Sequence, residues 1–179
     1  ELNMRLFAAL AQNPEADIEA ETADALAERY GRPLPRELAA MILDSEDVAA
    51  EAQNIRGVRC TGQDFYQLYY SLLRYGPMRR DWQRRLAATP ENIARVSRDK
   101  AAAVARADAM LGRIEALAPR LPARAAEEFR LCFGNLRRMA RESAAMHNSF
   151  MTLRGLKDGH LAPTAAALAP LLHRAHAGD

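Results

Sequence analysis

Apolar residues recur at every third or fourth position along most of the chain, which is the spacing of one face of an α-helix. The longest stripe begins after Thr89 and Pro90, a typical N-cap and a typical first helical residue. Its members are Ile93, Val96, the stem of Lys100, Val104, Ala107, Leu111, Ile114 and Leu117. The pattern predicts a helix of about eight turns that ends before Pro119.

A second long stripe follows a connection bracketed by Pro119 and Pro122 and extends over about residues 123–156. Its members are Phe129, Cys132, Phe133, Leu136, Ala140, Ser143, His147, Phe150 and Leu153. Helices joined by so short a connection become antiparallel neighbours, because neither is stable in water without a packed partner. We expect the two stripes to face each other, with Cys132 as a small core residue. The residues expected to be largely buried are Ile93, Val104, Leu111, Ile114, Phe129, Phe133, Leu136 and Phe150.

Two shorter helices are predicted before this pair. The first covers residues 1–12 and ends at the Asn-Pro pair of residues 13–14. Its apolar residues are Leu2, Leu6, Phe7 and Leu10, on one side. The second covers residues 18–30, where Asp17 is a plausible N-cap and Gly31 a typical C-terminal glycine.

A third helix is predicted from Pro35 to Ile55, with Gly57 at its end. Its stripe consists of Leu38, Met41, Ile42, Ser45, Val48, Ala52 and Ile55. The tail over residues 164–175 can form one more helix. Alternating strand patterns are almost absent, so we expect an all-α helical bundle dominated by two long antiparallel helices, with the shorter helices packed around them.

We expect a single domain over residues 1–179. Its parts are a region of short helices (1–57), an aromatic and basic connecting segment (58–89), and the long helix pair with its tail (90–179). Hydrophobic residues make up 49% of the chain, which is enough for a sizeable core. No apolar run is long enough to span a bilayer, so no membrane contact is expected.

The connecting segment holds most of the aromatic residues, and these are the candidate contact residues. They are Tyr66, Tyr69, Tyr70, Tyr75 and Trp82, with Arg79 beside them. Tyrosine, tryptophan and arginine are enriched at interfaces and at stacking surfaces. Two interpretations stay open, because these side chains could instead cover the end of the long helix pair. A helix with aromatics around so much of its circumference favours some exposure to a partner.

Charge does not point to nucleic acid. The net charge is only +2, from 25 basic and 23 acidic residues. Arginines gather at Arg74, Arg79, Arg80, Arg84 and Arg85. A solvated or salt-bridged face explains this cluster better than phosphate binding does. The two cysteines, Cys60 and Cys132, are not needed as a disulfide in a domain of this size, and a cytoplasmic setting fits the composition.

No catalytic, metal or cofactor site is predicted. His173 and His176 could share a helical face, but no nearby acid or thiol completes a metal site. His147 lies on the second long stripe and is expected in the core or at its boundary. Carboxylate pairs lie at predicted helix starts, where the helix dipole explains them. Phosphate-binding loops, nucleophile elbows and zinc-protease helix motifs are absent from the sequence.

Three stretches resemble a known family. Residues 2–10 lead through Asn13-Pro14 and Asp17 to Arg29-Tyr30-Gly31. Residues 99–107 and the later spacing of Phe129, Phe133 and Leu136 are also similar. Together they resemble the C-terminal helical domain of large bacterial (β/α)8-barrel glycosidases of the α-glucuronidase-like kind. The family often carries one tryptophan before the Asn/Asp-Pro turn and another in the next helix, and these regions hold Ala11, Gln12 and Ala25 here.

In such enzymes the catalytic acids lie on the barrel, so the resemblance implies an accessory domain or fragment without catalytic residues of its own. Its expected partner is the catalytic barrel of the parent protein or a second copy of the chain. The alternative is a free-standing helical bundle that mediates an interaction or senses a ligand.

Overall fold

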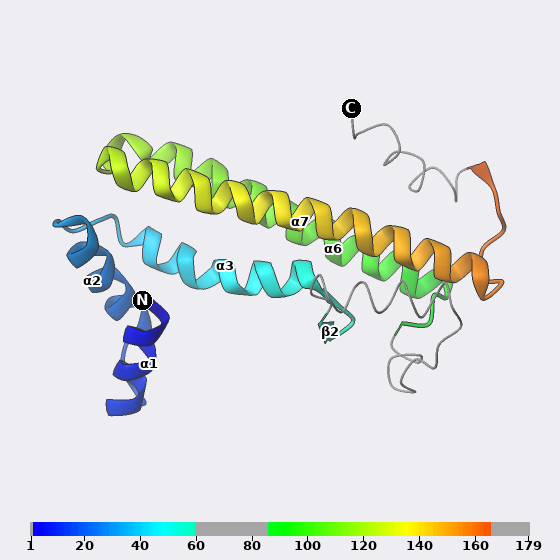
Figure 1. The fold of residues 1–179 in the computed structure, drawn as a ribbon, viewed down its shortest axis with the longest axis horizontal. Helices are drawn as coiled ribbons and strands as arrows, with labels where there is room; N and C mark the ends of the chain where they lie inside the picture. The colour runs from blue at the N-terminus through cyan, green and yellow to red at the C-terminus, as the bar shows by residue number, and fades with distance from the viewer. Residues whose placement is uncertain (1, 60–85, 166–179) are drawn as a thin grey trace. The chain divides into compact units, whose positions relative to one another are not determined.

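The structure is a computed structural model that describes residues 2–59 and 86–165. In these residues the fold is all-α, as predicted (Figure 1). The helices are α1 (Leu2–Gln12), α2 (Ile18–Tyr30), α3 (Glu37–Gln53), α6 (Pro90–Leu117), the short 3₁₀-helix η1 (Ala118–Arg120) and α7 (Ala123–Lys157). The extended residues of the described part form two-residue strands, β1 (Asn54–Ile55) and β2 (Val58–Arg59).

The helix ends confirm several sequence predictions. The Asp17 carboxylate accepts a hydrogen bond of 3.0 Å from the backbone N–H of Ala20, which caps α2. Gly31 has a left-handed φ of 68° and stops the same helix. At the start of α6, the Thr89 hydroxyl accepts from the N–H of Asn92 at 3.3 Å. These signals are local in sequence, which is why the pattern located them.

The predicted end of the third helix was wrong. Helix α3 ends at Gln53, and Ile55 belongs to an antiparallel hairpin in which it pairs with Val58. Arg56 and Gly57 between the strands both have positive φ, 48° and 77°, the combination of a type I′ hairpin turn. Ile55 is nonetheless fully buried. The burial of Ile55 was predicted correctly from its apolar side chain, but its helical backbone conformation was predicted wrongly.

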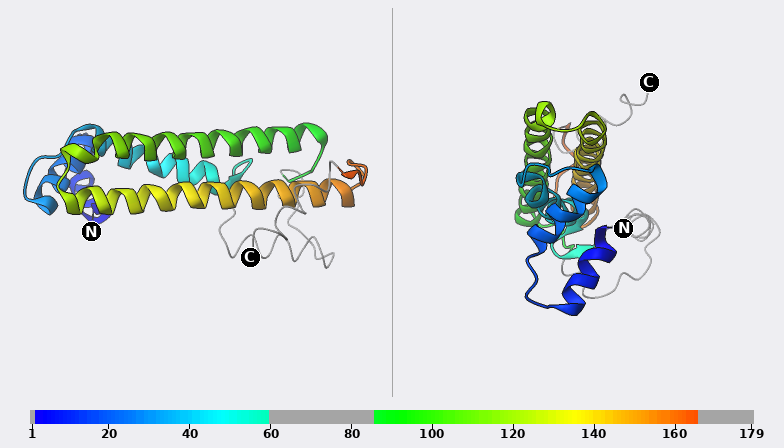
Figure 2. Two further views of the ribbon diagram at one scale, coloured as in Figure 1. Left: turned by 90° about the horizontal axis from the view of Figure 1, so that it is seen from above. Right: turned by 90° about the vertical axis from the view of Figure 1, so that its left-hand side faces the viewer.

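The chain forms two compact units. The first consists of residues 1–47 and 107–137, and the second of residues 48–106 and 138–179. In the first unit α1 packs against α2, shown in blue in Figure 2. Two ion pairs link α6 to α7 there, Glu115 to Arg130 at 2.9 Å and Asp108 to Arg137 at 3.9 Å. The core of this unit includes Leu26, Leu38, Met41, Met110, Ile114, Leu117, Phe129 and Phe133.

The second unit has its own apolar cluster. Its buried members are Ile55, Leu86, Ala88, Val96, Phe150 and Met151. The chain after α7 turns back on that helix, since the N–H groups of His160 and Leu161 both donate to the carbonyl of Gly155. A side chain on Gly155 would come within 2.9 Å of Leu161 and 3.0 Å of Ile93. Glycine at this position therefore permits a close approach of three segments.

The long stripes were predicted in part. Ile114, Phe129, Phe133 and Phe150 are buried, as expected. Half-buried positions are Ile93, Val104, Leu111 and Leu136. The α6 stripe has Val96, Ala107, Ile114 and Leu117 buried as predicted, while Ala103 and Met110 are buried beside the half-buried Val104 and Leu111, so the buried face is shifted by less than one residue. Cys132 is exposed, which corrects its assignment to the core; it precedes Phe133 by one residue and lies about 100° away around the helix.

Candidate functional site

The predicted contact residues lie outside the described part of the chain. Tyr66, Tyr69, Tyr70, Tyr75, Trp82 and Arg79 all fall within residues 60–85. Their role as a contact surface therefore stays a prediction. The tail residues His173 and His176 also fall outside the described residues.

An exposed apolar surface lies on α1 instead. It consists of Met4, Phe7 and Leu10, which are 72%, 70% and 40% exposed, and we call it the α1 face. Leu2 and Leu6 are half-buried, so the side predicted from Leu2, Leu6, Phe7 and Leu10 contains partly buried positions beside the exposed Phe7 and Leu10. No residue of α1 is buried. Large aliphatic and aromatic side chains gathered in this way are typical of a contact surface.

The charge on α1 is directed away from this face. Arg5 is the one charged residue of Leu2–Gln12. Its guanidinium donates to Glu28 on α2 at 2.5 Å and lies 3.9 Å from Glu21. The α1 face is therefore uncharged, and its natural complement is an apolar surface.

Glu128 on α7 is the anchor of α2. Its carboxylate accepts hydrogen bonds from Arg124 Nε at 2.9 Å, from the Tyr30 hydroxyl at 2.8 Å and from Arg29 at 2.8 Å. These three donors, Arg124 first, lower the pKa of Glu128 from 4.5 to about 2. The Tyr30 ring also packs on Phe129, with ring centroids 5.9 Å apart. The three donors all bind the Glu128 carboxylate, so this arrangement is structural and leaves no group poised for acid–base chemistry.

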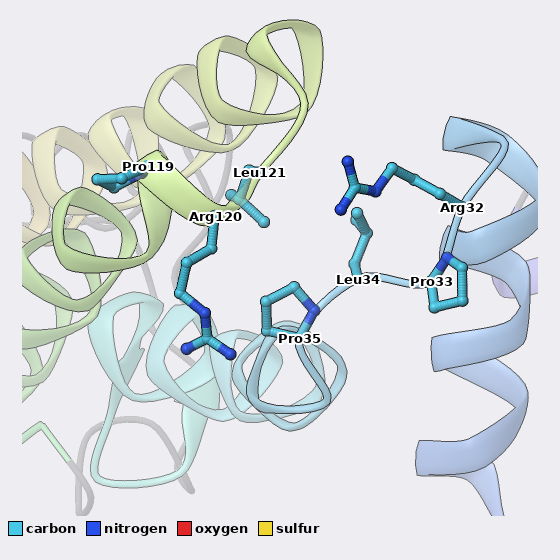
Figure 3. Close-up of a pocket in the computed structure, with 7 residues that line it drawn as sticks. All are labelled: Arg32, Pro33, Leu34, Pro35, Pro119, Arg120 and Leu121. Carbon is cyan, nitrogen blue, oxygen red and sulfur yellow. The ribbon is translucent and has the colours of Figure 1, made fainter.

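The second polar feature of this unit is a depression between two loops, which we call the Arg32–Arg120 pocket (Figure 3). The connection between α2 and α3 supplies one wall and the turn around η1 supplies the other. Its lining residues are Arg32, Pro33, Leu34, Pro35, Pro119, Arg120 and Leu121. Figure 3 shows the Arg32 side chain extending toward Leu121 above Leu34, while the Arg120 side chain extends toward Pro35. The exposed lining of this open depression is mostly polar, with a guanidinium group on each wall.

Lys100, including its ammonium group, is fully buried in the second unit. Its Nζ donates to the carbonyls of Glu51 at 2.6 Å, Ala52 at 2.9 Å and Asn54. The last carbonyls of a helix have no partner within it, so Lys100 caps the C-terminus of α3. We expected only the stem of Lys100 on this face. The place of Lys100 in the apolar stripe predicted that its stem is buried. The carbonyls that bind its ammonium group were not predicted, because they belong to residues about fifty positions earlier in the chain.

His147 is buried close enough to Lys100 to sense its charge. Burial first, and then the Lys100 charge, lower the pKa of His147 from 6.5 to about 3. The imidazole is therefore neutral near pH 7, as expected for a core histidine. A neutral, fully buried imidazole beside a fixed ammonium contributes to packing and has no route to a solvent-borne substrate.

Other site types are not found in the residues that the structure describes. Among residues 2–59 and 86–165, no three His, Cys, Asp or Glu side chains are grouped so that they could hold a metal ion. No helix in the same residues is long and apolar enough to cross a membrane. Within the described part of the chain, the features left for function are the α1 face and the Arg32–Arg120 pocket.

Comparison with known proteins adds no assignment. No protein-family model matches the chain, and neither the curated proteins nor the solved structures show significant similarity to it.

Proposed function

We propose that the chain is a non-catalytic helical accessory domain of a carbohydrate-active enzyme and that it packs against the catalytic barrel of that enzyme through the α1 face. The observation that carries the docking role is the exposure of Met4, Phe7 and Leu10 on a helix without a buried residue. The enzyme class rests on the resemblance of residues 2–31, 99–107 and 129–136 to barrel glycosidases.

The long helices serve in this proposal as the rigid support. We propose that α6 and α7, 28 and 35 residues long, run antiparallel beside each other along their length. Support comes from each unit separately. In the first, Asp108 pairs with Arg137 and Glu115 with Arg130, so that later residues of α6 meet earlier residues of α7. In the second, Val96 and Phe150 share one apolar cluster. A scaffold of this kind holds α1 at one place, since Glu128 on α7 fixes α2 and α2 carries α1.

Self-association is the second candidate, and the absence of charge from the α1 face favours it. With Arg5 bound to α2, two copies can bring this face together without opposing like charges. In that case the chain is a free-standing interaction domain, and the same residues form a two-fold interface.

The test compares the isolated chain with the complete gene product that contains it. Phe7→Glu places a carboxylate at the centre of the α1 face, and burying an unpaired charge costs several kcal/mol. We expect no loss of thermal stability in the isolated chain, because Phe7 is 70% exposed there. In the complete protein the melting temperature of the helical domain should fall by several degrees. Gln12→Glu adds the same charge to an exposed position of α1 and serves as the matched control.

Three results would redirect the proposal. Unfolding of the isolated chain by Phe7→Glu would place the α1 face in the core of the chain itself. A dimer of the isolated chain, dissociated by Phe7→Glu but not by Gln12→Glu in light-scattering measurements of molar mass, would support self-association. A complete gene product without a (β/α)8 barrel would remove the glycosidase assignment.

A further inference from the structure

The Arg32–Arg120 pocket is surrounded by more positive than negative charge. Its lining contains two arginines and no carboxylate. The two segments that form it, residues 32–37 and 119–121, together carry three arginines and one glutamate, a charge of +2. This is as much net charge as the whole chain has. An open, polar surface with such an excess of positive charge attracts an anionic ligand.

The two lining arginines are weakly engaged within the chain. In the part of the chain that the structure describes, no ion pair or side-chain hydrogen bond joins the Arg32 guanidinium to another residue. Arg120 donates to Glu37 over 3.2 Å, and both side chains of this pair are well exposed. Exposed pairs of this kind contribute little and exchange readily. A carboxylate from another molecule can therefore replace Glu37 at Arg120.

The excess positive charge is confined to a small area. Helix α3, which follows the first segment, contains five acidic residues and no basic residue. Helix α2, which precedes that segment, contains four acidic residues and one arginine. A long polyanion such as nucleic acid would be repelled where it extended beyond the pocket along either helix. The charge distribution therefore favours a short anionic ligand.

The geometry favours a ligand with two separate anionic groups. Arg32 and Arg120 lie on different walls, and Figure 3 shows Arg32 extending toward Leu121 while Arg120 extends toward Pro35. Each guanidinium can bind one carboxylate through two parallel hydrogen bonds. The prolines of both segments have fixed φ angles, which limits the backbone freedom that binding would remove. Small-molecule sites enclose most of their ligand, whereas an open depression can receive an extended peptide.

We propose that the Arg32–Arg120 pocket binds a short acidic segment of a partner protein, with one carboxylate paired to Arg32 and another to Arg120. Glu37 occupies Arg120 in the unbound chain and competes with the incoming carboxylate. Because the charges are exposed, the contact steers and orients the partner and supplies only part of the affinity. This surface lies on the α2–α3 connection and on η1, so its role does not depend on the α1 face or on the glycosidase assignment.

The probe is a hexaglutamate peptide, titrated into the isotope-labelled full chain and followed by backbone amide shifts. At about 20 mM salt we expect a dissociation constant of about 1 mM, with shifts concentrated at residues 32–37 and 119–121. Raising the salt to about 0.5 M should weaken binding at least about tenfold, because exposed charges are screened. The corresponding hexaglutamine peptide, which has no carboxylate side chains, should cause no shifts.

Variants of opposite sign make the test specific. Arg32→Gln and Arg120→Gln should each weaken binding about three- to fivefold, because one ion pair is lost. Arg113→Gln removes the same charge from an exposed position of the same unit outside the pocket and should change the affinity less than about 1.5-fold. Glu37→Gln removes the competitor at Arg120 and should strengthen binding about threefold. Its control is Glu19→Gln, at an exposed position near the start of α2, which should have less than about half of that effect.

Four results would overturn the proposal. They are the absence of shifts at residues 32–37 and 119–121 up to about 20 mM peptide, equal weakening by Arg113→Gln and by the two pocket variants, an unchanged affinity in Glu37→Gln, and tighter binding of inorganic diphosphate than of the peptide at the same residues. The last result would identify a phosphate site instead. Circular dichroism of each variant checks that the helices are intact.

Discussion

Lys100→Met is the most informative single substitution in the second unit. Methionine keeps the length of the apolar stem but removes the ammonium group that caps α3. The carbonyls of Glu51, Ala52 and Asn54 then lose their common donor. The position is fully buried, so water cannot replace the lysine without rearrangement of the core.

The size of the effect follows from two opposing contributions. Each buried carbonyl left without a donor costs about 1–3 kcal/mol, which gives roughly 3–9 kcal/mol for three. Removing the buried ammonium recovers a desolvation cost of several kcal/mol, and two of the three bonds are only partly buried. We therefore expect the free energy of unfolding to fall by about 2–5 kcal/mol.

Urea unfolding followed by circular dichroism measures this change. Arg98→Met removes a charge from an exposed position of the same helix and should change the free energy of unfolding by less than about 0.5 kcal/mol. As a second readout, Lys100→Met should raise the pKa of His147 above about 3, because the Lys100 charge is the smaller of the two causes that lower it and burial, the larger cause, remains. A loss below about 1 kcal/mol with an unchanged pKa of His147 would refute the capping role.

Two further predictions concern pH and backbone conformation. The unfolded chain takes up a proton on His147 near pH 6.5, and the folded chain does so only near pH 3. The free energy of unfolding should therefore fall as the pH falls through this window, by up to about 1.4 kcal/mol per pH unit. In urea titrations, His147→Leu should remove that dependence between about pH 6.5 and 4.5. Gly134 lies in the middle of a helix with open space around it, so Gly134→Ala should raise the free energy of unfolding by about 0.5–1 kcal/mol. Gly31 has a φ of 68°, so Gly31→Ala should lower the stability of the protein. Changes of the opposite sign in thermal melts would contradict this reasoning.

The sequence predicted those parts of the fold that depend on neighbouring residues. The caps at Asp17 and Thr89 and the stop at Gly31 each involve groups no more than four residues apart. The hairpin after α3 was not predicted, because nothing in the sequence indicates that Arg56 has a positive φ. A stripe of apolar residues does not fix the edges of the buried face, which explains why Ala103 and Met110 are buried while Val104 and Leu111 are half-buried.

The candidate site was less accessible to sequence reasoning. Met4 and Phe7 have the composition of core residues, and periodicity does not distinguish a face that packs within the chain from one that awaits a partner. The Arg32–Arg120 pocket joins residues nearly ninety positions apart. A sequence shows prolines and arginines in both loops, but only the fold brings the loops together.

Hydrogen exchange on α1 tests the central claim most directly. The measurement compares backbone amides of residues 5–12 in the isolated chain with the same amides in the complete gene product, at equal protein concentration. If the α1 face docks on the catalytic barrel, exchange of these amides should slow by at least about tenfold in the complete protein, while α7 amides near Phe133 change little. Equal exchange rates in the two samples would contradict the docking role of the α1 face.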